Sequence, residues 1–134
     1  MNFMNLIEEE NLEELEKLIK EGWFEFINKN DLQGYDLNKQ NPSGMKPIHY
    51  AIENEKEDVF ELLSKYYEDL DIPDVTGMTP LHYAVTHENK KIIEILLQRK
   101  VDIYKPDNDG ESPIDIATSQ IKKFIESCLG VELQ

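Results

Sequence analysis

Apolar residues recur along the chain with the spacing of short amphipathic helices, and turn-forming residues separate them. The segment PLHYAV, which begins at Pro80, places its apolar residues three and four positions apart, so that they share one helix face. The segment KKIIEILLQRK at 90–100 has the same spacing over a longer run. The polar residues THEN at 86–89 lie between the two segments. The pattern therefore predicts a helix, a turn and a second helix.

This helix-turn-helix group occurs twice at a fixed spacing. The segment GMKPIHYA at 44–51 returns as GMTPLHYA at 77–84, 33 residues later. Aligning 44–76 with 77–109 without gaps gives 12 identical residues, and six further positions keep an apolar residue of a similar kind. A fixed period of this length is typical of a repeat protein, in which each unit buries its apolar face against its neighbours.

Local signals define the ends of the helices in 77–109. Gly77 is a turn residue, Thr79 can cap a helix, and Pro80 suits the first helical position, where no backbone N–H is needed. The segment VDIYKPDNDG at 101–110 is rich in aspartate, asparagine and proline, which predicts an extended, turn-rich connection. Each unit is therefore predicted to consist of a helix, a turn, a second helix and a loop.

The repeat resembles the ankyrin repeat, whose signature is G-x-T-P-L-H-x-A with a 33-residue period. GMTPLHYA matches it at every fixed position. The resemblance implies an all-α solenoid of stacked helix-turn-helix units with projecting hairpin loops and a concave surface. We expect a single domain over 1–134 with four repeats. These are an N-terminal repeat over 1–43 with a loop insertion at 23–34, full repeats over 44–76 and 77–109, and a C-terminal cap over 110–134.

The chain departs from the family pattern at several turn positions. Lys46 replaces the capping threonine, a loss that typically costs about 1 kcal/mol. Glu55 and Glu88 stand between the helices, where the family usually has glycine. Tyr67 and Lys100 replace the glycine after the second helix, where a positive φ is expected. These departures predict altered turns and an unchanged fold.

Charge narrows the range of partners. The net charge is −14, from 28 acidic and 14 basic side chains, and residues 1–76 carry 19 acidic against 7 basic, which is −12. Such a balance disfavours nucleic acid and anionic membrane surfaces. No apolar run reaches the length of a membrane span, and the start lacks the regions of a signal peptide. The acidic helix faces are either ordinary solvated surface or a surface that attracts a basic segment of a partner.

Candidate chemical groups are few. The single cysteine, Cys128, excludes an internal disulfide and favours a cytoplasmic or nuclear location, and its spacing from Ile125 predicts a place in the core. His49 and His82 stand one repeat apart without a third ligand nearby in sequence. The family resemblance implies that both histidines are structural. We therefore expect no metal, no cofactor and no catalytic residues.

The predicted function is a non-catalytic protein–protein interaction module. The alternative is a regulatory ankyrin domain of a larger enzyme or carrier, such as an acyl-CoA-binding protein. By the family register, a partner would contact the hairpin tips and the exposed end of each first helix. The candidate residues are Pro42, Ser43, Met45, Glu53, Asn54, Val75, Thr76, Met78, Thr86, His87, Asn108, Asp109 and Glu111.

Two features suggest an apolar anchor for the partner. Met45 and Met78 occupy one column of the repeat, and methionine adapts readily to a partner surface. Trp23 and Phe24 lie in the insertion, where they either cover the open end of the first repeat or anchor a partner. We expect a protein partner with a basic segment and an apolar anchor, and a chain that is monomeric on its own.

Overall fold

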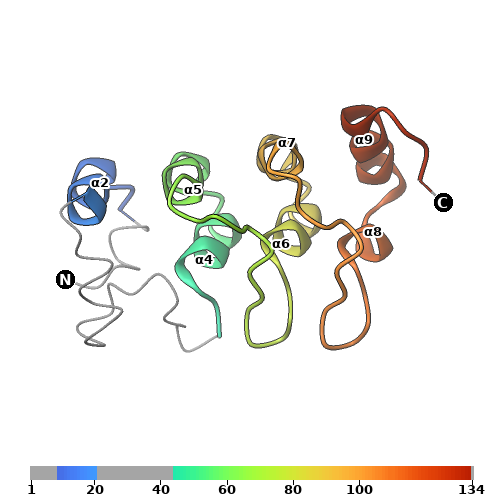
Figure 1. Cartoon of the computed structure of the whole chain (residues 1–134), viewed down its shortest axis with the longest axis horizontal. Coiled ribbons are helices and arrows are strands. Elements are labelled where there is room, and N and C mark those ends of the chain that lie inside the picture. The colour runs from blue at the N-terminus through green and yellow to red at the C-terminus, as the bar shows by residue number, and fades with distance from the viewer. Residues whose placement is uncertain (1–8, 21–43, 134) are drawn as a thin grey trace. The chain divides into compact units, whose positions relative to one another are not determined.

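The computed structural model describes residues 9–20 and 44–133, which contain seven helices and no strand. The predicted all-α class is therefore confirmed for this part of the chain. The described residues form two compact units, one within residues 1–67 and one within 68–134 (Figure 1). The predicted insertion at 23–34 lies outside the described residues, and the single domain stays a prediction.

The first unit contains three helices: α2 (Leu12–Lys20), α4 (Pro47–Glu53) and α5 (Glu57–Ser64). Both α2 and α4 pack against α5. The core takes Leu15 from α2, and the apolar columns of the predicted repeat supply the rest. Those buried residues are Ile48, Ala51, Ile52, Val59, Phe60, Leu62 and Leu63.

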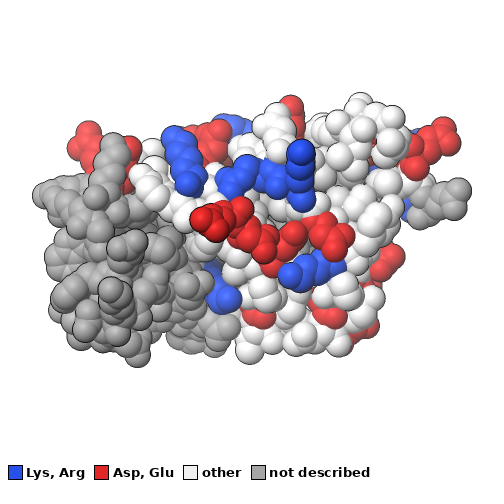
Figure 2. All heavy atoms as spheres, viewed as in Figure 1, with Lys and Arg blue, Asp and Glu red and all other residues white. Residues whose placement is uncertain are grey.

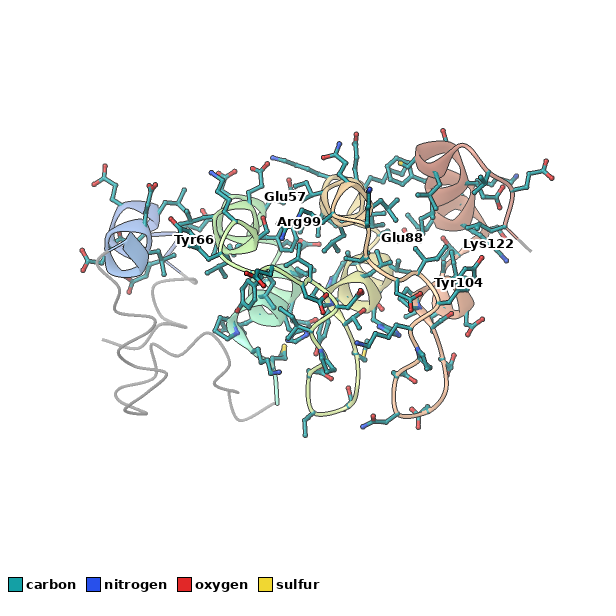
Figure 3. All side chains as sticks on the ribbon, viewed as in Figure 1. Glu57, Tyr66, Glu88, Arg99, Tyr104 and Lys122 are labelled. Atoms are coloured by element: carbon teal, nitrogen blue, oxygen red, sulfur yellow. The ribbon has the colours of Figure 1, made fainter. Side chains whose placement is uncertain are left out.

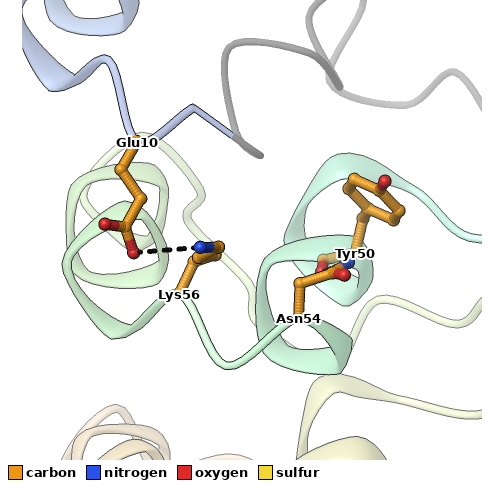
Figure 4. Close-up of polar contacts among 4 residues, drawn as sticks. All are labelled: Glu10, Tyr50, Asn54 and Lys56. Atoms are coloured by element: carbon orange, nitrogen blue, oxygen red, sulfur yellow. Dashed lines mark hydrogen bonds and ion pairs between the residues drawn. The ribbon is translucent and has the colours of Figure 1, made fainter.

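One ion pair at the surface joins the segments that precede two of these helices. Lys56 Nζ lies 3.5 Å from Glu10 Oε1, and the two side chains are 29% and 50% exposed (Figure 4). Solvent screens such a pair, so it contributes at most about 1 kcal/mol. The helix packing, rather than this contact, holds the unit together.

The second unit contains two stacked helix pairs: α6 (Pro80–Thr86) with α7 (Lys90–Gln98), and α8 (Pro113–Ile116) with α9 (Ser119–Leu129). α6 packs on α8 and α7 packs on α9, so like helices lie next to each other. The buried apolar residues of this unit come from both helix pairs and from the segments before and between them. They are Leu70, Leu81, Tyr83, Ala84, Val85, Ile92, Ile93, Leu96, Leu97, Val101, Ile103, Ile114, Ile121 and Ile125.

Side-chain hydroxyls cap the starts of α6 and α8, at the predicted Thr79 and at Ser112. Thr79 Oγ1 accepts the N–H of His82 at the start of α6, and Ser112 Oγ accepts the N–H of Asp115 at the start of α8. Lys46 holds the same extended backbone, with φ −82° and ψ 165° against −87° and 168° at Thr79, but makes no side-chain cap. The prediction of a missing cap at Lys46 is confirmed.

Replacing Lys46 with threonine should therefore raise the free energy of unfolding by about 1 kcal/mol, because the backbone already has the conformation that a threonine cap uses. Chemical denaturation followed by circular dichroism measures the change. The reciprocal Thr79→Lys variant should lose more than this amount, because it removes the cap hydrogen bond and places a charged side chain where Thr79 is fully buried. A Lys46→Thr variant that is less stable than the parent would contradict the register of the repeat.

Three of the four glycine-replacing residues adopt a left-handed backbone. Glu55, Glu88 and Lys100 have φ values of 56°, 52° and 59°. At Tyr67 the φ is not positive, so the turn there is altered, as the departure from glycine predicts. The reason is that α5 ends at Ser64 and the chain leaves it through Lys65 in a right-handed turn, with φ −67° and ψ −21°. The two second helices therefore end differently.

The left-handed conformation costs a residue with a side chain about 1 kcal/mol that glycine does not incur. Lys100 is exposed and follows α7, so Lys100→Gly should raise the free energy of unfolding by about this amount. Lys100→Ala removes the same charge but keeps the strained backbone, and it serves as the control. Thermal unfolding of both variants checks the prediction, which requires the glycine variant to melt higher than the alanine variant.

Candidate functional site

Two loop tips of the second unit, residues 74–78 and 107–111, are built in the same way and are called the paired tips below. In the first, Asp74 Oδ1 accepts the N–H of Thr76 at 2.8 Å and the N–H of Met78 at 3.0 Å. In the second, Asp107 Oδ1 accepts the N–H groups of the residues two and four positions later, each at 2.9 Å. A glycine with a positive φ, Gly77 or Gly110, completes each turn.

Direct hydrogen bonds hold the two tips side by side. The Asn108 N–H donates to Thr76 O at 2.9 Å, and Asn108 Nδ2 donates to Val75 O at 3.1 Å. Figure 3 shows both loops extending together toward the bottom of the view, below the labelled Glu88 and Tyr104. The structure thus brings together Val75, Thr76 and Asn108, which the sequence had placed in separate repeats.

His82 attaches the second tip to α6. Its ring is fully buried, and Nδ1 accepts the N–H of Thr79 at 2.9 Å. Because a backbone N–H can only donate, the ring proton is on Nε2, which donates to Glu111 O at 2.9 Å. His49 is also fully buried and accepts the N–H of Lys46 at 3.2 Å. Both histidines therefore have structural contacts.

Asp74 joins the first tip to the same helix. The carboxylate is 8% exposed, its Oδ1 also accepts Thr76 Oγ1 at 2.7 Å, and its Oδ2 accepts the hydroxyl of Tyr83. Burial acts to raise the pKa of Asp74, but the hydrogen bonds from Tyr83, Thr76 and Met78 outweigh it and hold the pKa below its ordinary value. Asp74 is therefore ionised inside the turn that it organises.

The candidate residues differ in how much surface they present. Val75 is the most exposed large apolar residue of the paired tips, at 56%, whereas Met78 next to Gly77 is only half-buried. The remaining candidates that the structure describes fall into two groups. Glu53, Asn54, Thr76, Thr86, Asn108, Asp109 and Glu111 are exposed, while Met45 and His87 are half-buried.

Not all candidates lie at the paired tips. Thr86 and His87 are at the far end of α6, about 10 Å along the helix from its start at Pro80. Glu53 and Asn54 belong to the first unit, where Asn54 Nδ2 donates to Tyr50 O at 2.9 Å (Figure 4). The other four candidates, Pro42, Ser43, Trp23 and Phe24, lie outside the described residues.

One exposed aromatic residue was not predicted. Tyr104 is 56% exposed in the connection between α7 and α8, and Figure 3 shows it away from the ends of the loops. Tyr104 occupies the same repeat position as Asp71. This change from a charged to an aromatic residue between two repeats is the sequence feature that could have identified Tyr104. Aromatic residues are enriched at protein interfaces, which makes Tyr104 a further contact candidate.

The core position predicted for Cys128 is wrong. Ile121 and Ile125 of α9 are buried, but Cys128 is exposed and Leu129 is 39% exposed. The buried stripe of α9 ends at Ile125. Helical spacing identifies the apolar face of a helix, but it does not tell how far along that face a neighbouring helix covers it. Partial burial, and then the negative charge of Glu94, raise the pKa of the Cys128 thiol, so that it is a poor nucleophile.

Negative charge concentrates at the second of the paired tips. Residues 107–115 carry four acidic side chains and no basic one. Asp109 and Glu111 are exposed, and Asp115 accepts the N–H of Ser112 at 2.9 Å. On the face shown in Figure 2, acidic side chains gather beside basic ones. The paired tips therefore combine an exposed valine with a local negative charge.

Metal-holding clusters and membrane-spanning helices are absent from the described residues. In 9–20 and 44–133, no three His, Cys, Asp or Glu side chains are grouped so that they could hold a metal ion. No helix among these residues is long and apolar enough to cross a membrane. What this part of the chain offers is a surface of loop tips and helix ends.

Comparison with known families agrees with the geometry. The family described as ankyrin repeats (3 copies) matches residues 3–107 and again residues 74–127. No curated protein matches the chain. The family match includes the paired tips and all seven described helices except the end of α9. Together with the stacked helix pairs and the 33-residue period, it shows that this chain belongs to the ankyrin-repeat family.

Proposed function

We propose that this protein is a binding module that holds a segment of a partner protein against the paired tips. Ankyrin repeats are generally protein–protein interaction modules. The observation that carries the proposal is the exposed Val75, fixed in a hydrogen-bonded turn beside an acidic neighbouring tip.

The chemistry of the paired tips selects a basic partner segment with one apolar side chain. An apolar side chain would cover Val75, while lysine or arginine on the same segment would face Asp109 and Glu111. Complementary charge mainly raises the association rate, whereas apolar contact lengthens the life of the complex. The half-buried Met78 would add to the apolar contact on the first tip.

The rigidity of the tips favours binding. Each turn is organised by an aspartate, and the two turns are joined to each other and to α6 by hydrogen bonds. A surface that is already ordered loses little conformational entropy on binding, which preserves affinity. The exposed Thr86 at the end of α6 would extend the contact surface of the second unit in a longer partner. The candidates Met45, Glu53 and Asn54 of the first unit stay predicted contact residues.

A pull-down with matched bait variants tests this function. The tip variant carries Val75→Lys and Asp109→Lys, and the control carries Gln98→Lys and Glu94→Lys on the exposed side of α7. Both variants gain the same charge. We expect partner proteins recovered with the parent chain to be reduced at least about tenfold with the tip variant, a loss typical of disrupted contact residues, and retained with the control.

Mass spectrometry with isotope-labelled quantification measures the recovery, and circular dichroism verifies that both variants fold. Equal recovery with the tip variant and the parent chain would contradict the proposed function. Loss of partners with the control alone would place the binding surface on α7 instead.

A further inference from the structure

Asn108 uses its backbone and its side chain to join the paired tips. Its N–H and its Nδ2 reach consecutive carbonyl groups of the first tip, those of Thr76 and Val75. The side-chain amide is thus engaged within the protein, although the residue is exposed. The exposed side chains on either side of this joint, Val75 and Asp109, remain directed to the surface.

The joint depends on the absence of a side chain at Gly77. A Cβ atom there would lie 2.6 Å from Asn108 Oδ1 and 2.8 Å from Asn108 N, closer than such atoms approach in proteins. Gly110 has the same backbone conformation, with φ +83° against +82°, but a Cβ atom at Gly110 would meet nothing within 4 Å. An alanine at either glycine therefore carries the cost of the left-handed backbone, but only an alanine at Gly77 also occupies the space that the joint requires.

We propose that Asn108 is a positioning residue that holds the paired tips as one binding edge, so that a single partner segment contacts both. This inference rests on the proposed function. Asn108 itself contributes little direct contact to the partner, because its donors are directed at Val75 O and Thr76 O. Its effect on binding comes through the fixed spacing of Val75 and Asp109.

Three neutral substitutions test this role: Asn108→Ala, Gly77→Ala and Gly110→Ala. None changes the net charge, so any difference in binding reflects geometry and not attraction between charges. Asn108→Ala removes the side-chain amide, including the Nδ2 donor, and keeps the backbone N–H. Gly77→Ala displaces both the side chain and the backbone N–H of Asn108, and Gly110→Ala matches the backbone strain of Gly77→Ala without the clash.

The first readout is hydrogen exchange of the Asn108 backbone amide, measured by NMR on the full chain. In the parent chain and in Gly110→Ala, this amide should be protected by its bond to Thr76 O. In Gly77→Ala it should exchange about tenfold faster, because the joint opens locally. Equal exchange rates in the two glycine variants would overturn the inference, whatever the binding result.

The second readout is an NMR titration with a short peptide of alternating arginine and leucine residues. In the parent chain, shifts should occur at both tips and follow one common binding curve. The apparent affinity of Asn108→Ala should be roughly threefold or more below that of the parent chain, and the affinity of Gly77→Ala should be lower than that of Gly110→Ala by a similar factor. The reason is that binding must then also order the two tips relative to each other, which costs conformational entropy.

The outcomes separate the two proposals. Shifts at both tips with unchanged affinity in Asn108→Ala and Gly77→Ala would overturn the positioning role and leave the proposed function intact. A peptide that shifts residues elsewhere and neither tip would overturn both. A peptide of alternating glutamate and leucine should not bind the tips in any variant.

Discussion

Replacing His82 with alanine should lower the free energy of unfolding by about 3 kcal/mol. The substitution leaves a cavity where the ring is fully buried. It also removes the acceptor for the Thr79 N–H and the donor to Glu111 O. Second-tip residues should lose protection from hydrogen exchange, because Glu111 O no longer has its partner from α6.

The control for His82→Ala is His87→Ala. His87 belongs to the same helix pair but is half-buried in the turn after α6, so its removal should cost less than about 1 kcal/mol. Urea denaturation followed by circular dichroism measures both variants. Similar stabilities for the two variants would mean that His82 does not hold the second tip on α6.

Replacing Asp74 with alanine should cost about 3 kcal/mol near pH 7, because it removes the hydrogen bond from the buried Tyr83 hydroxyl and three further hydrogen bonds within the first tip. The corresponding Asp107→Ala variant is the control. Asp107 organises the second tip in the same way, but Ile116 stands at the repeat position of Tyr83 and offers no hydroxyl. That variant should lose only about 1 kcal/mol.

The effect of Asp74 should depend on pH with a definite sign. Folding lowers the pKa of Asp74 below its ordinary value of 3.8, so its charged form stabilises the fold at every pH above that value. This stabilisation is lost as the pH falls through the lower pKa of the folded state. The difference in unfolding free energy between the parent chain and Asp74→Ala should therefore narrow below about pH 4. A constant difference across that range would contradict the role given to the carboxylate.

Much of the fold was predictable because its signals are local. Thr79 and Ser112 cap helices where a hydroxyl precedes a proline, and the apolar columns of the 33-residue period became the buried residues of the core. The positive φ at Lys100 followed from its place after the second helix, where the family has glycine. In each case, a short run of sequence determines the backbone conformation.

The rest depended on contacts between residues far apart in the sequence. The bond from Asn108 to Val75 spans 33 residues, and no feature of either loop alone indicates it. From the sequence we expect Met78 to offer the apolar contact on the first tip. In the structure Val75 is exposed and Met78 is half-buried, because the fold of the turn decides which side chain faces outward. The extent to which neighbouring helices cover α9 likewise decided the exposure of Cys128.

Photo-cross-linking from defined positions tests most directly whether the paired tips bind the partner. Benzoylphenylalanine is placed at Val75, at Asp109 or at Gln98 of α7, which are all exposed, and each full-length chain is irradiated in a native lysate. We expect cross-links from positions 75 and 109 to one segment of the same protein, with basic residues in that segment and no cross-link from position 98. Cross-links to that protein from position 98, with none from 75 or 109, would contradict the assignment of the paired tips as the binding surface.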